Sequence, residues 1–411
     1  KWEWGYGRKY AGITTVPGLL TRPGEINPDT VWLKRVVRLP KGNWSDVMIE
    51  MKGARFCPSV YINRQKVTQS PGGMAPIFKK LSHPALKPDN EVEVEIALLP
   101  LDKMDKGDAS RIPEADLWRS NVSSCIWDDI VLHFYRKAAI KTMVVQSDIK
   151  KDAAVMYYEL EKQDNTKKQL LLTFEDQAGK ELISKTVELS DANGTFRVDL
   201  HKWIKTWSPE GPALYTIRLK LMDQAGLCDE KSVVFGHKEF QVKGLQFELN
   251  GSPVKLRAAS VVWHRWVRDP AAKELAWDEA WFEKNIVQRL KDLGANTLRF
   301  HLGLPPHKFL SLCVRYGLMV QSEWSFFHGM KASPESLQEQ WPQWFNASLK
   351  HPSVVLMHGW NETDDETELQ VANSVINKVA GNYNDVVIGH RDVIHVHKYW
   401  WSLFENLGLY Y

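Results

Sequence analysis

The carboxyl group of Glu362 is the one in this sequence best placed to act as a proton donor in catalysis. It ends the run His351-Pro-Ser-Val-Val-Leu-Met-His-Gly-Trp-Asn-Glu362, in which an apolar stretch leads to an indole (Trp360) and an amide (Asn361). Burial beside an indole raises the pKa of a carboxyl group, because desolvation disfavours its ionised form. Such a group can protonate a leaving oxygen near neutral pH. The alternative is a residue in the first turn of the next helix, where acidic side chains are favoured. Spacing alone leaves both interpretations open.

Other polar residues also end apolar runs. Glu323 closes Gln321-Ser-Glu-Trp324, and it can bind a hydroxyl group or orient Glu362. Its alternative role is a buried salt bridge with Arg299. Arg299 and His301 are two positions apart, so they share one face of a strand. They are candidates either for binding substrate or for completing the polar lining of the predicted barrel. Further substrate-binding candidates are His264, His397 and Trp400.

The chain contains 18 Trp residues. An indole offers a flat apolar face and one N–H donor, a combination that suits the C–H side of a sugar ring. Core filling should account for most of them. The candidates for stacking platforms are Trp263, Trp266, Trp324, Trp360, Trp400 and Trp401.

A metal site is not predicted. His390, His395 and His397 are close in sequence, but no carboxylate or Cys completes a recognisable ligand set around them. Glycine-rich nucleotide loops, Gly-x-Ser-x-Gly and His-Glu-x-x-His are absent from the sequence. We therefore expect neither a cofactor nor a metal.

Composition narrows the possible partners. The 411 residues carry a formal charge of +3. A chain so close to neutral does not predict the broad basic surface that binds nucleic acids or anionic membranes. No apolar run approaches the roughly 20 residues that span a bilayer. The four Cys residues are scattered, which excludes a disulfide scaffold. We expect no nucleic-acid or membrane partner, and homo-oligomer formation is left open.

The hydrophobic pattern predicts a multidomain protein. Short alternating runs separated by turn residues predict β-sandwiches over residues 1–139, of jelly-roll type, and 140–241, of immunoglobulin-like type. Residues 242–411 alternate between strand-like and helix-like segments, which predicts parallel βα units and a (β/α)8 TIM barrel. The predicted helices are 278–293, 305–315, 335–349 and 366–380. In a barrel, the polar residues at the carboxyl ends of the strands are the ones to expect in chemistry.

Five short motifs follow one another along the chain. They are Val60-Tyr-Ile-Asn63 with Gly72-Gly73 and Pro76, Ser124-Cys-Ile-Trp-Asp-Asp-Ile-Val-Leu132, Phe235-Gly-His-Lys-Glu239 with Phe247 through Arg257, Leu312-Cys-Val-Arg-Tyr-Gly-Leu318, and His351-Pro-Ser through Glu362. In this order they resemble glycoside hydrolase family 2, the group of β-galactosidases, β-glucuronidases and β-mannosidases. The resemblance covers essentially the whole chain.

The resemblance implies a retaining exo-β-glycosidase of β-galactosidase or β-glucuronidase type that acts on carbohydrate. Glu362 would be the acid/base, and Asn361 would contact the sugar 2-hydroxyl. The family's nucleophile follows on a later strand, so we expect the barrel to be only partly present. Glu405 is the weak candidate for this nucleophile. A non-catalytic carbohydrate-binding protein with a degenerate barrel is the alternative, and a scaffold without sugar affinity is a third. The expected location is periplasmic or secreted.

Overall fold

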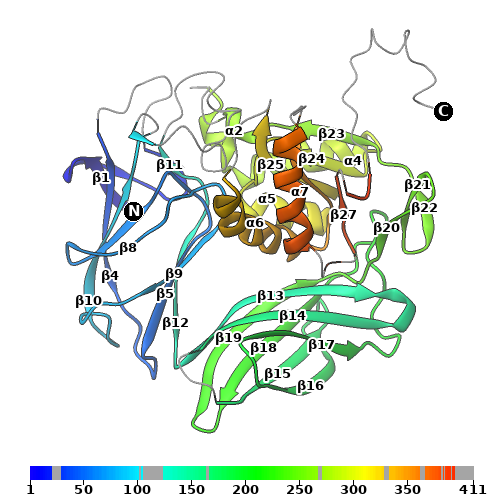
Figure 1. Ribbon diagram of the computed structural model, residues 1–411, viewed down its shortest axis with the longest axis horizontal. Coiled ribbons are helices and arrows are strands. Elements are labelled where there is room, and N and C mark those ends of the chain that lie inside the picture. Colours follow the sequence, from blue (N-terminus) through cyan, green and yellow to red (C-terminus); the bar gives the residue numbers. More distant parts are fainter. Residues whose placement is uncertain are drawn as a thin grey trace.

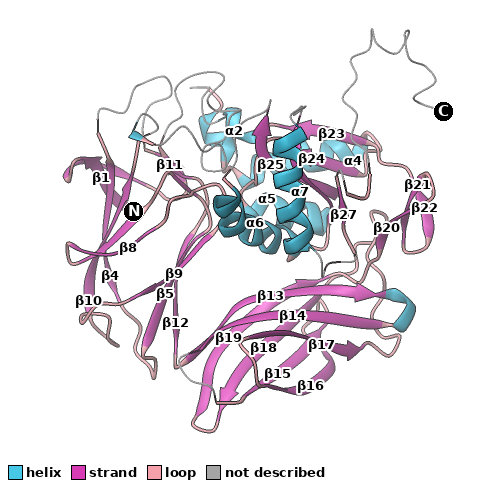
Figure 2. Ribbon diagram, viewed as in Figure 1, coloured by secondary structure: helices cyan, strands magenta, loops and turns pink. Residues whose placement is uncertain are grey.

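The computed structural model describes most of the chain in three β-rich units (Figures 1 and 2). The described residues are 1–20, 29–100, 103–104, 124–162, 166–266, 271–327, 333–361, 366–380, 383, 385–389 and 391–393. Among the helices in these ranges, none combines the length and the low charge content that crossing a bilayer requires.

The first unit, here called the N-terminal sandwich, consists of antiparallel strands around one apolar core. A six-stranded sheet with the order β2-β1-β4-β10-β7-β8 and a three-stranded sheet with the order β12-β5-β9 both contribute buried side chains to this core. On β10, Val92, Val94, Ile96 and Leu98 alternate inward, as the period of two predicts. The strands are β1 (Trp2–Tyr6), β2 (Lys9–Thr14), β3 (Gly18–Leu19), β4 (Val31–Arg38), β5 (Asp46–Met51), β6 (Ala54–Arg55), β7 (Ser59–Ile62), β8 (Gln65–Gln69), β9 (Ile77–Leu81), β10 (Glu91–Leu98), β11 (Cys125–Ile126) and β12 (Ile130–Tyr135).

The second unit, the middle sandwich, has a separate core between two further antiparallel sheets. Their strand orders are β13-β14-β17 and β16-β15-β18-β19. Inward residues again alternate, for example Leu170, Leu172 and Phe174 on β15. The elements are β13 (Ala138–Asp148), the short 3-10 helix η2 (Ile149–Lys151), β14 (Ala153–Lys162), β15 (Lys168–Glu175), β16 (Glu181–Leu189), β17 (Asn193–Asp199), β18 (Tyr215–Asp223) and β19 (Gly226–Phe235).

In the third unit, the parallel unit, the described residues form five parallel strands in sequential order. A small antiparallel sheet leads into it: β20 (Phe240–Lys243), β21 (Gln246–Leu249) and β22 (Ser252–Val254). The parallel strands are β23 (Ala258–Val261), β24 (Thr297–Phe300), β25 (Met319–Phe327), β26 (Val354–Asn361) and β27 (Val387–Ile388). Every residue of β26 is buried, as expected for a parallel strand covered on both faces.

Helices connect these strands and pack against them. They are α2 (Trp263–Trp266), η3 (Lys273–Ala276), α3 (Glu279–Phe282), η4 (Glu283–Gln288), α4 (Arg289–Asp292), α5 (His307–Tyr316), α6 (Pro334–Leu349) and α7 (Glu366–Ala380). Figure 1 shows α6 and α7 side by side, and the two helices contact each other. Ser333 caps α6 ahead of Pro334, and Gly317 ends α5 in a left-handed conformation, which glycine adopts without steric cost.

The predicted alternation of parallel strands and helices is confirmed. The helix predicted over 366–380 has those limits, and the helix predicted over 278–293 is one helical stretch, α3 through α4, with a π-helical turn at its centre. Strand β27 was not predicted, because two residues are too few to establish a pattern. Of the residues that follow β27, those after Val393 lie outside the described residues.

Candidate functional site

Polar side chains gather near the carboxyl ends of β24 and β26 and at the middle of β25 between them. Arg299 is the one residue of β24 that is not fully buried. Glu323 was expected to end its strand, but the neighbouring β25 continues to Phe327, so Glu323 lies at its middle. Asn361 is the last residue of β26. The register places β24 beside β25 and β25 beside β26, all parallel, so their carboxyl ends meet at one edge. Arg299, His301, Glu323 and Asn361, which the sequence analysis singled out as polar residues that follow apolar runs, contact one another as described below.

Glu323 is the centre of this group. Its side chain is only 1% exposed. One carboxylate oxygen, Oε1, accepts hydrogen bonds from Arg299 Nε at 2.5 Å and Gln321 Nε2 at 2.7 Å. The other, Oε2, lies 2.6 Å from His301 Nδ1 and accepts from the Leu302 N–H at 3.3 Å. A buried carboxylate with partners on both oxygens is strongly held in one orientation.

These contacts decide the protonation state of Glu323. Burial by itself would raise the pKa of the carboxyl group, but hydrogen bonds from His301 and His358 and the charge of Arg299 outweigh it. Together they hold the pKa well below its usual range. Glu323 is therefore ionised near neutral pH and is no proton donor. The interpretation of Glu323 as a buried salt-bridge partner of Arg299 is confirmed.

Arg299 connects Glu323 to Asn361. Its Nη2 donates to Asn361 Oδ1 at 2.8 Å while its Nε contacts Glu323. Asn361 is 3% exposed, and within the described part of the chain its amide nitrogen Nδ2 has no hydrogen-bond partner. A buried amide donor without a partner is costly, so such a group usually serves a ligand or a water molecule. We call Glu323, Arg299 and Asn361 the strand-end array.

Two contacts of the array were missed by sequence reasoning. His358 is buried within β26, with its Nδ1 3.8 Å from Glu323 Oε1, and Gln321 shares a strand face with Glu323. Both lie inside strands rather than at their ends. A histidine within an otherwise apolar run, and a polar residue two positions before Glu323, were the available signals.

Several predicted site residues lie outside the described residues. These are Glu362, Glu405, His397 and Trp400, together with His390, His395 and Trp401. Their roles therefore stay predictions.

His264 was expected to face substrate, and the structure corrects this. It is 1% exposed, packs against the Trp263 ring with the two rings tilted to each other, and contacts the Arg55 guanidinium of the N-terminal sandwich. Burial and the neighbouring Arg55 charge hold the pKa of His264 well below its usual range, so the ring is neutral. His264 thus belongs to the packing between two units rather than to an open site.

The expected tryptophan platforms also need correction. Trp360 is 2% exposed and stacks on Trp341 of α6, with ring centroids 6.5 Å apart. Trp324 contacts Trp341 and Trp344 in the same buried cluster, and Trp263 is fully buried. These indoles have no exposed face for a sugar ring. Trp266 is partly buried against Trp281. Core filling, the alternative stated for most Trp residues, accounts for the buried ones.

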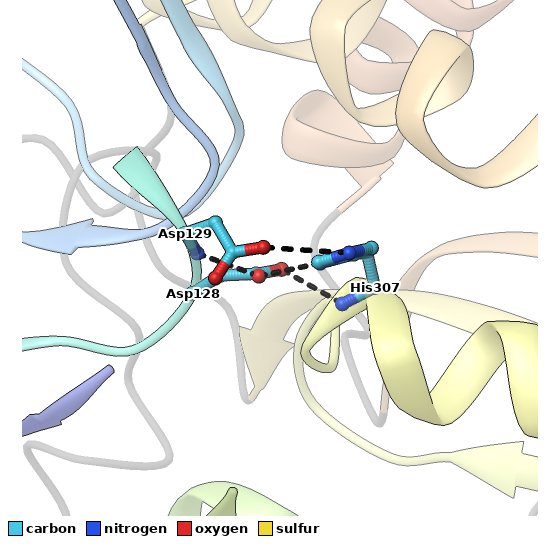
Figure 3. A group of neighbouring side chains, drawn as sticks. All are labelled: Asp128, Asp129 and His307. Carbon is cyan, nitrogen blue, oxygen red and sulfur yellow. Dashed lines mark hydrogen bonds and ion pairs between the residues drawn. The ribbon is translucent and has the colours of Figure 1, made fainter. Parts of the chain in front are cut away.

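A second group of polar side chains joins the N-terminal sandwich to the parallel unit. Figure 3 shows Asp128 and Asp129 facing His307, the first residue of α5. Asp128 accepts from the backbone N–H of His307 at 2.7 Å and lies 2.6 Å from its Nδ1. Asp129 Oδ2 is 3.6 Å from His307 Nε2. Lys52 Nζ lies 3.3 Å from the same His307 nitrogen and 3.6 Å from Asp129 Oδ2. The lysine already supplies the positive charge that a metal ion would bring, so we assign the group to the contact between units.

Asp128 should therefore stabilise the start of α5. Pro306, which precedes this helix, provides no side-chain cap, and Asp128 supplies the acceptor and the negative charge that favour a helix N-terminus. We expect Asp128→Ala to lower the free energy of unfolding by about 1–3 kcal/mol. Asp129→Ala, which removes a longer and more exposed ion pair, should cost less than about 1 kcal/mol. Urea unfolding measures both, and equal losses would contradict the assignment.

The fold and the strand-end array define a class of protein: a chain with two antiparallel sandwiches and a parallel βα unit that carries a polar site at its strand ends. The family model for glycosyl hydrolases family 2 matches residues 138–238. A putative β-glucuronidase of Formosa agariphila is 31% identical over 199 residues, which cover 46% of this chain and 18% of that protein. The β-glucuronidase of Sus scrofa is 24% identical over 396 residues, 89% of this chain and 57% of that protein.

Solved structures share this fold. The structure of a putative β-galactosidase from Bacteroides fragilis matches with a TM-score of 0.75 and 18% identity, covering 94% of this chain and 62% of that chain. Over residues 138–238 this chain is thus similar to glycosyl hydrolases of family 2, and its sequence is also similar to the two β-glucuronidases. The chain spans 18% of the Formosa relative and 57% of the Sus scrofa relative. The activity and substrates of the whole protein are therefore proposed below.

Proposed function

We propose that this chain forms the part of a retaining exo-β-glycosidase that binds the terminal sugar and protonates the leaving group. The strand-end array is the observation that carries this proposal. It fixes the Asn361 amide at the carboxyl edge of a parallel sheet, immediately before the carboxyl group of Glu362 in sequence. An amide beside a general acid can donate a hydrogen bond to the sugar 2-hydroxyl, a contact that strengthens in the transition state of glycoside hydrolysis.

The domain layout is part of the same proposal. Residues 1–139 would form a jelly-roll domain, residues 140–241 an immunoglobulin-like domain, and residues 242–411 part of a (β/α)8 TIM barrel. The sequential order of five parallel strands supports the barrel, because barrel strands neighbour one another in chain order. The two cores between antiparallel sheets support the sandwiches.

The proposed reaction has two steps. In the first, Glu362 donates its proton to the glycosidic oxygen while a second carboxylate attacks the anomeric carbon, so the carbon–oxygen bond to the leaving group breaks and a glycosyl ester forms. In the second, the Glu362 carboxylate takes a proton from water, the water oxygen attacks the anomeric carbon, and the ester bond breaks to release the sugar. Glu405 remains the weak proposal for the second carboxylate.

The array would act on this reaction through position rather than proton transfer. Glu323 is ionised and holds Arg299, and Arg299 holds the Asn361 carbonyl oxygen. The Asn361 N–H groups are then left to donate to the 2-hydroxyl, a contact that strengthens as the transition state forms. Within this proposal Glu323 and Arg299 are positioning residues.

The proposed substrates are terminal β-galactosides or β-glucuronides of oligo- or polysaccharides. The relatives and the structural neighbour named above carry the names β-glucuronidase and β-galactosidase. We also propose a periplasmic or secreted location, where the enzyme would have access to such oligo- and polysaccharides.

Hydrolysis of matched substrates tests this function. The full-length protein is incubated with 4-nitrophenyl β-galactoside, β-glucuronide and β-mannoside, and with the α-anomer of each hydrolysed sugar. We expect turnover of a β-glycoside, with NMR showing the β-anomer of the sugar as the first product. Turnover confined to α-glycosides, or first release of the α-anomer, would refute the proposed mechanism. Sugar binding without turnover would favour a carbohydrate-binding protein.

A further inference from the structure

A cavity of about 850 Å³ lies where the three units meet, and none of the residues of the strand-end array lines it. Its walls come from β5 and β12 of the N-terminal sandwich, from β13, β18 and β19 of the middle sandwich, and from α5 and α6 of the parallel unit. Figure 1 shows these elements converging at the junction. The volume is in the range of sites that hold small organic molecules.

The charged residues that line this cavity are unbalanced. Glu50 is the acidic residue in the lining, against five basic ones: Lys52, Lys141, Lys231, Arg315 and Lys350. Three of the five have acidic partners of their own. These pairs are Lys52 with Asp129 at 3.6 Å, Lys141 with Glu159 at 2.6 Å, and Arg315 with Glu279 at 3.7 Å.

The remaining two cations, Lys231 and Lys350, form no ion pair with any residue in the described ranges. Among the described hydrogen bonds, Lys231 Nζ makes a long contact of 3.5 Å to the Lys141 carbonyl oxygen. Burial lowers the pKa of both ammonium groups, with partial compensation from the Glu50 charge. Glu50 cannot neutralise both, because one carboxylate carries one charge and already accepts from His133 at 2.8 Å.

Two uncharged polar groups in the lining also lack partners. Within the described residues, His351 Nε2 and Gln343 Oε1 are buried without a hydrogen bond. Burial and the neighbouring cations hold the pKa of His351 well below its usual range, so its ring is neutral and can donate one hydrogen bond. The rest of the wall includes apolar side chains, among them Phe78, Met143, Leu214, Val233 and Val314.

We propose that this cavity binds a small organic anion, in which a carboxylate or phosphate group meets Lys231 and Lys350 and an apolar body meets Phe78 and Met143. Uncompensated cations in a partly desolvated cavity favour an anion, and hydrogen bonds between charged groups are the strong ones. Because the walls belong to all three units, the bound anion would also fix the units relative to one another. This site is separate from the proposed catalytic one.

Titration calorimetry on the full-length protein tests the proposal with four probes at one ionic strength. They are phenyl phosphate, benzoate, inorganic phosphate and the neutral phenyl β-glucoside. We expect phenyl phosphate or benzoate to bind, with the tighter of the two identifying the headgroup, and to raise the melting temperature by several degrees at saturation. Inorganic phosphate should bind at least about tenfold more weakly, because it lacks the apolar body.

Two lysine variants and one matched control make the test specific. Lys350→Met and Lys231→Met, which act from different units, should each weaken binding by at least about tenfold. Lys180→Met removes an exposed charge and should bind like the parent. Without ligand, Lys350→Met should melt no lower than the parent, because the variant loses a poorly compensated charge. Absence of binding by every probe, binding only of the neutral glucoside, or equal affinity in the parent and both cavity variants would overturn the proposal.

Discussion

Glu362→Gln is expected to lower kcat/KM for a phenyl β-glycoside by about 10²–10⁴-fold. Glutamine keeps the shape of the side chain but has no proton to give to the phenolate oxygen. A 2,4-dinitrophenyl glycoside should lose much less in its first step, because its leaving group departs without protonation. Comparing the two substrates on the parent and the variant therefore isolates proton donation from binding.

The matched control for Glu362 is Glu366→Gln. Glu366 is an exposed residue at the start of α7, four positions further along, so this variant tests the loss of a nearby acidic charge without the proposed role. It should keep activity within about twofold of the parent, since exposed substitutions have small effects. Added azide, which needs no general base, should yield a β-glycosyl azide with the Glu362→Gln variant. Undiminished hydrolysis by that variant would remove Glu362 from the mechanism.

Glu323→Gln is expected to cost about 3–5 kcal/mol in the free energy of unfolding, the loss typical of breaking a buried ion pair from one side. The carboxylate is almost fully buried and contacts both Arg299 and His301. A neutral amide would leave the Arg299 charge without its partner. Catalytic activity should fall together with the free energy of unfolding, because Arg299 would no longer hold Asn361 in place.

The control for Glu323 is Glu188→Gln, which breaks an exposed ion pair with Lys167. That change should alter the free energy of unfolding by less than about 0.5 kcal/mol. Urea unfolding of the parent and both variants makes the comparison. Equal effects at the two sites would contradict the assignment of Glu323 as the anchor of the array.

The pH dependence of stability should follow from the same carboxyl group. The folded-state pKa of Glu323 is lowered, so its contribution is complete above the unfolded pKa of about 4.3 and disappears as the pH falls through the lower folded value. Glu50, whose pKa is lowered to about 2, acts in the same direction. The parent should therefore lose stability between about pH 5 and pH 2, and Glu323→Gln should lose distinctly less over that interval. An unchanged slope would show that Glu323 is not ionised in the folded protein.

The sequence predicted those parts of the site that depend on a single strand. Arg299, Glu323 and Asn361 follow or end apolar runs, and parallel strands bring such positions to one edge. His358 was missed because its contact with Glu323 depends on the register between β25 and β26, which no single segment contains. Gln321 shares a strand face with Glu323, so its contact could have been predicted from their spacing of two. The helices were predictable for the opposite reason, since the period of one apolar face is a local property.

The tryptophans show where local patterns fail. Trp324 and Trp360 lie in β25 and β26 next to Glu323 and Asn361, but α6 brings Trp341 and Trp344 against them and buries all four. His264 follows a strand as well, and Arg55 of another unit covers it. Packing between distant segments decided the exposure of these side chains, and nothing in their spacing indicated it.

The most direct test of the strand-end array is a double comparison between Asn361→Ala and the sugar 2-hydroxyl. The measured quantity is kcat/KM for an aryl β-glycoside and for its 2-deoxy analogue, with the parent and with the variant. If Asn361 donates to the 2-hydroxyl, the variant should lose about 10²-fold on the ordinary glycoside and almost nothing further on the 2-deoxy analogue. Equal losses on the two substrates would show that the amide does not face that hydroxyl and would contradict the proposed site.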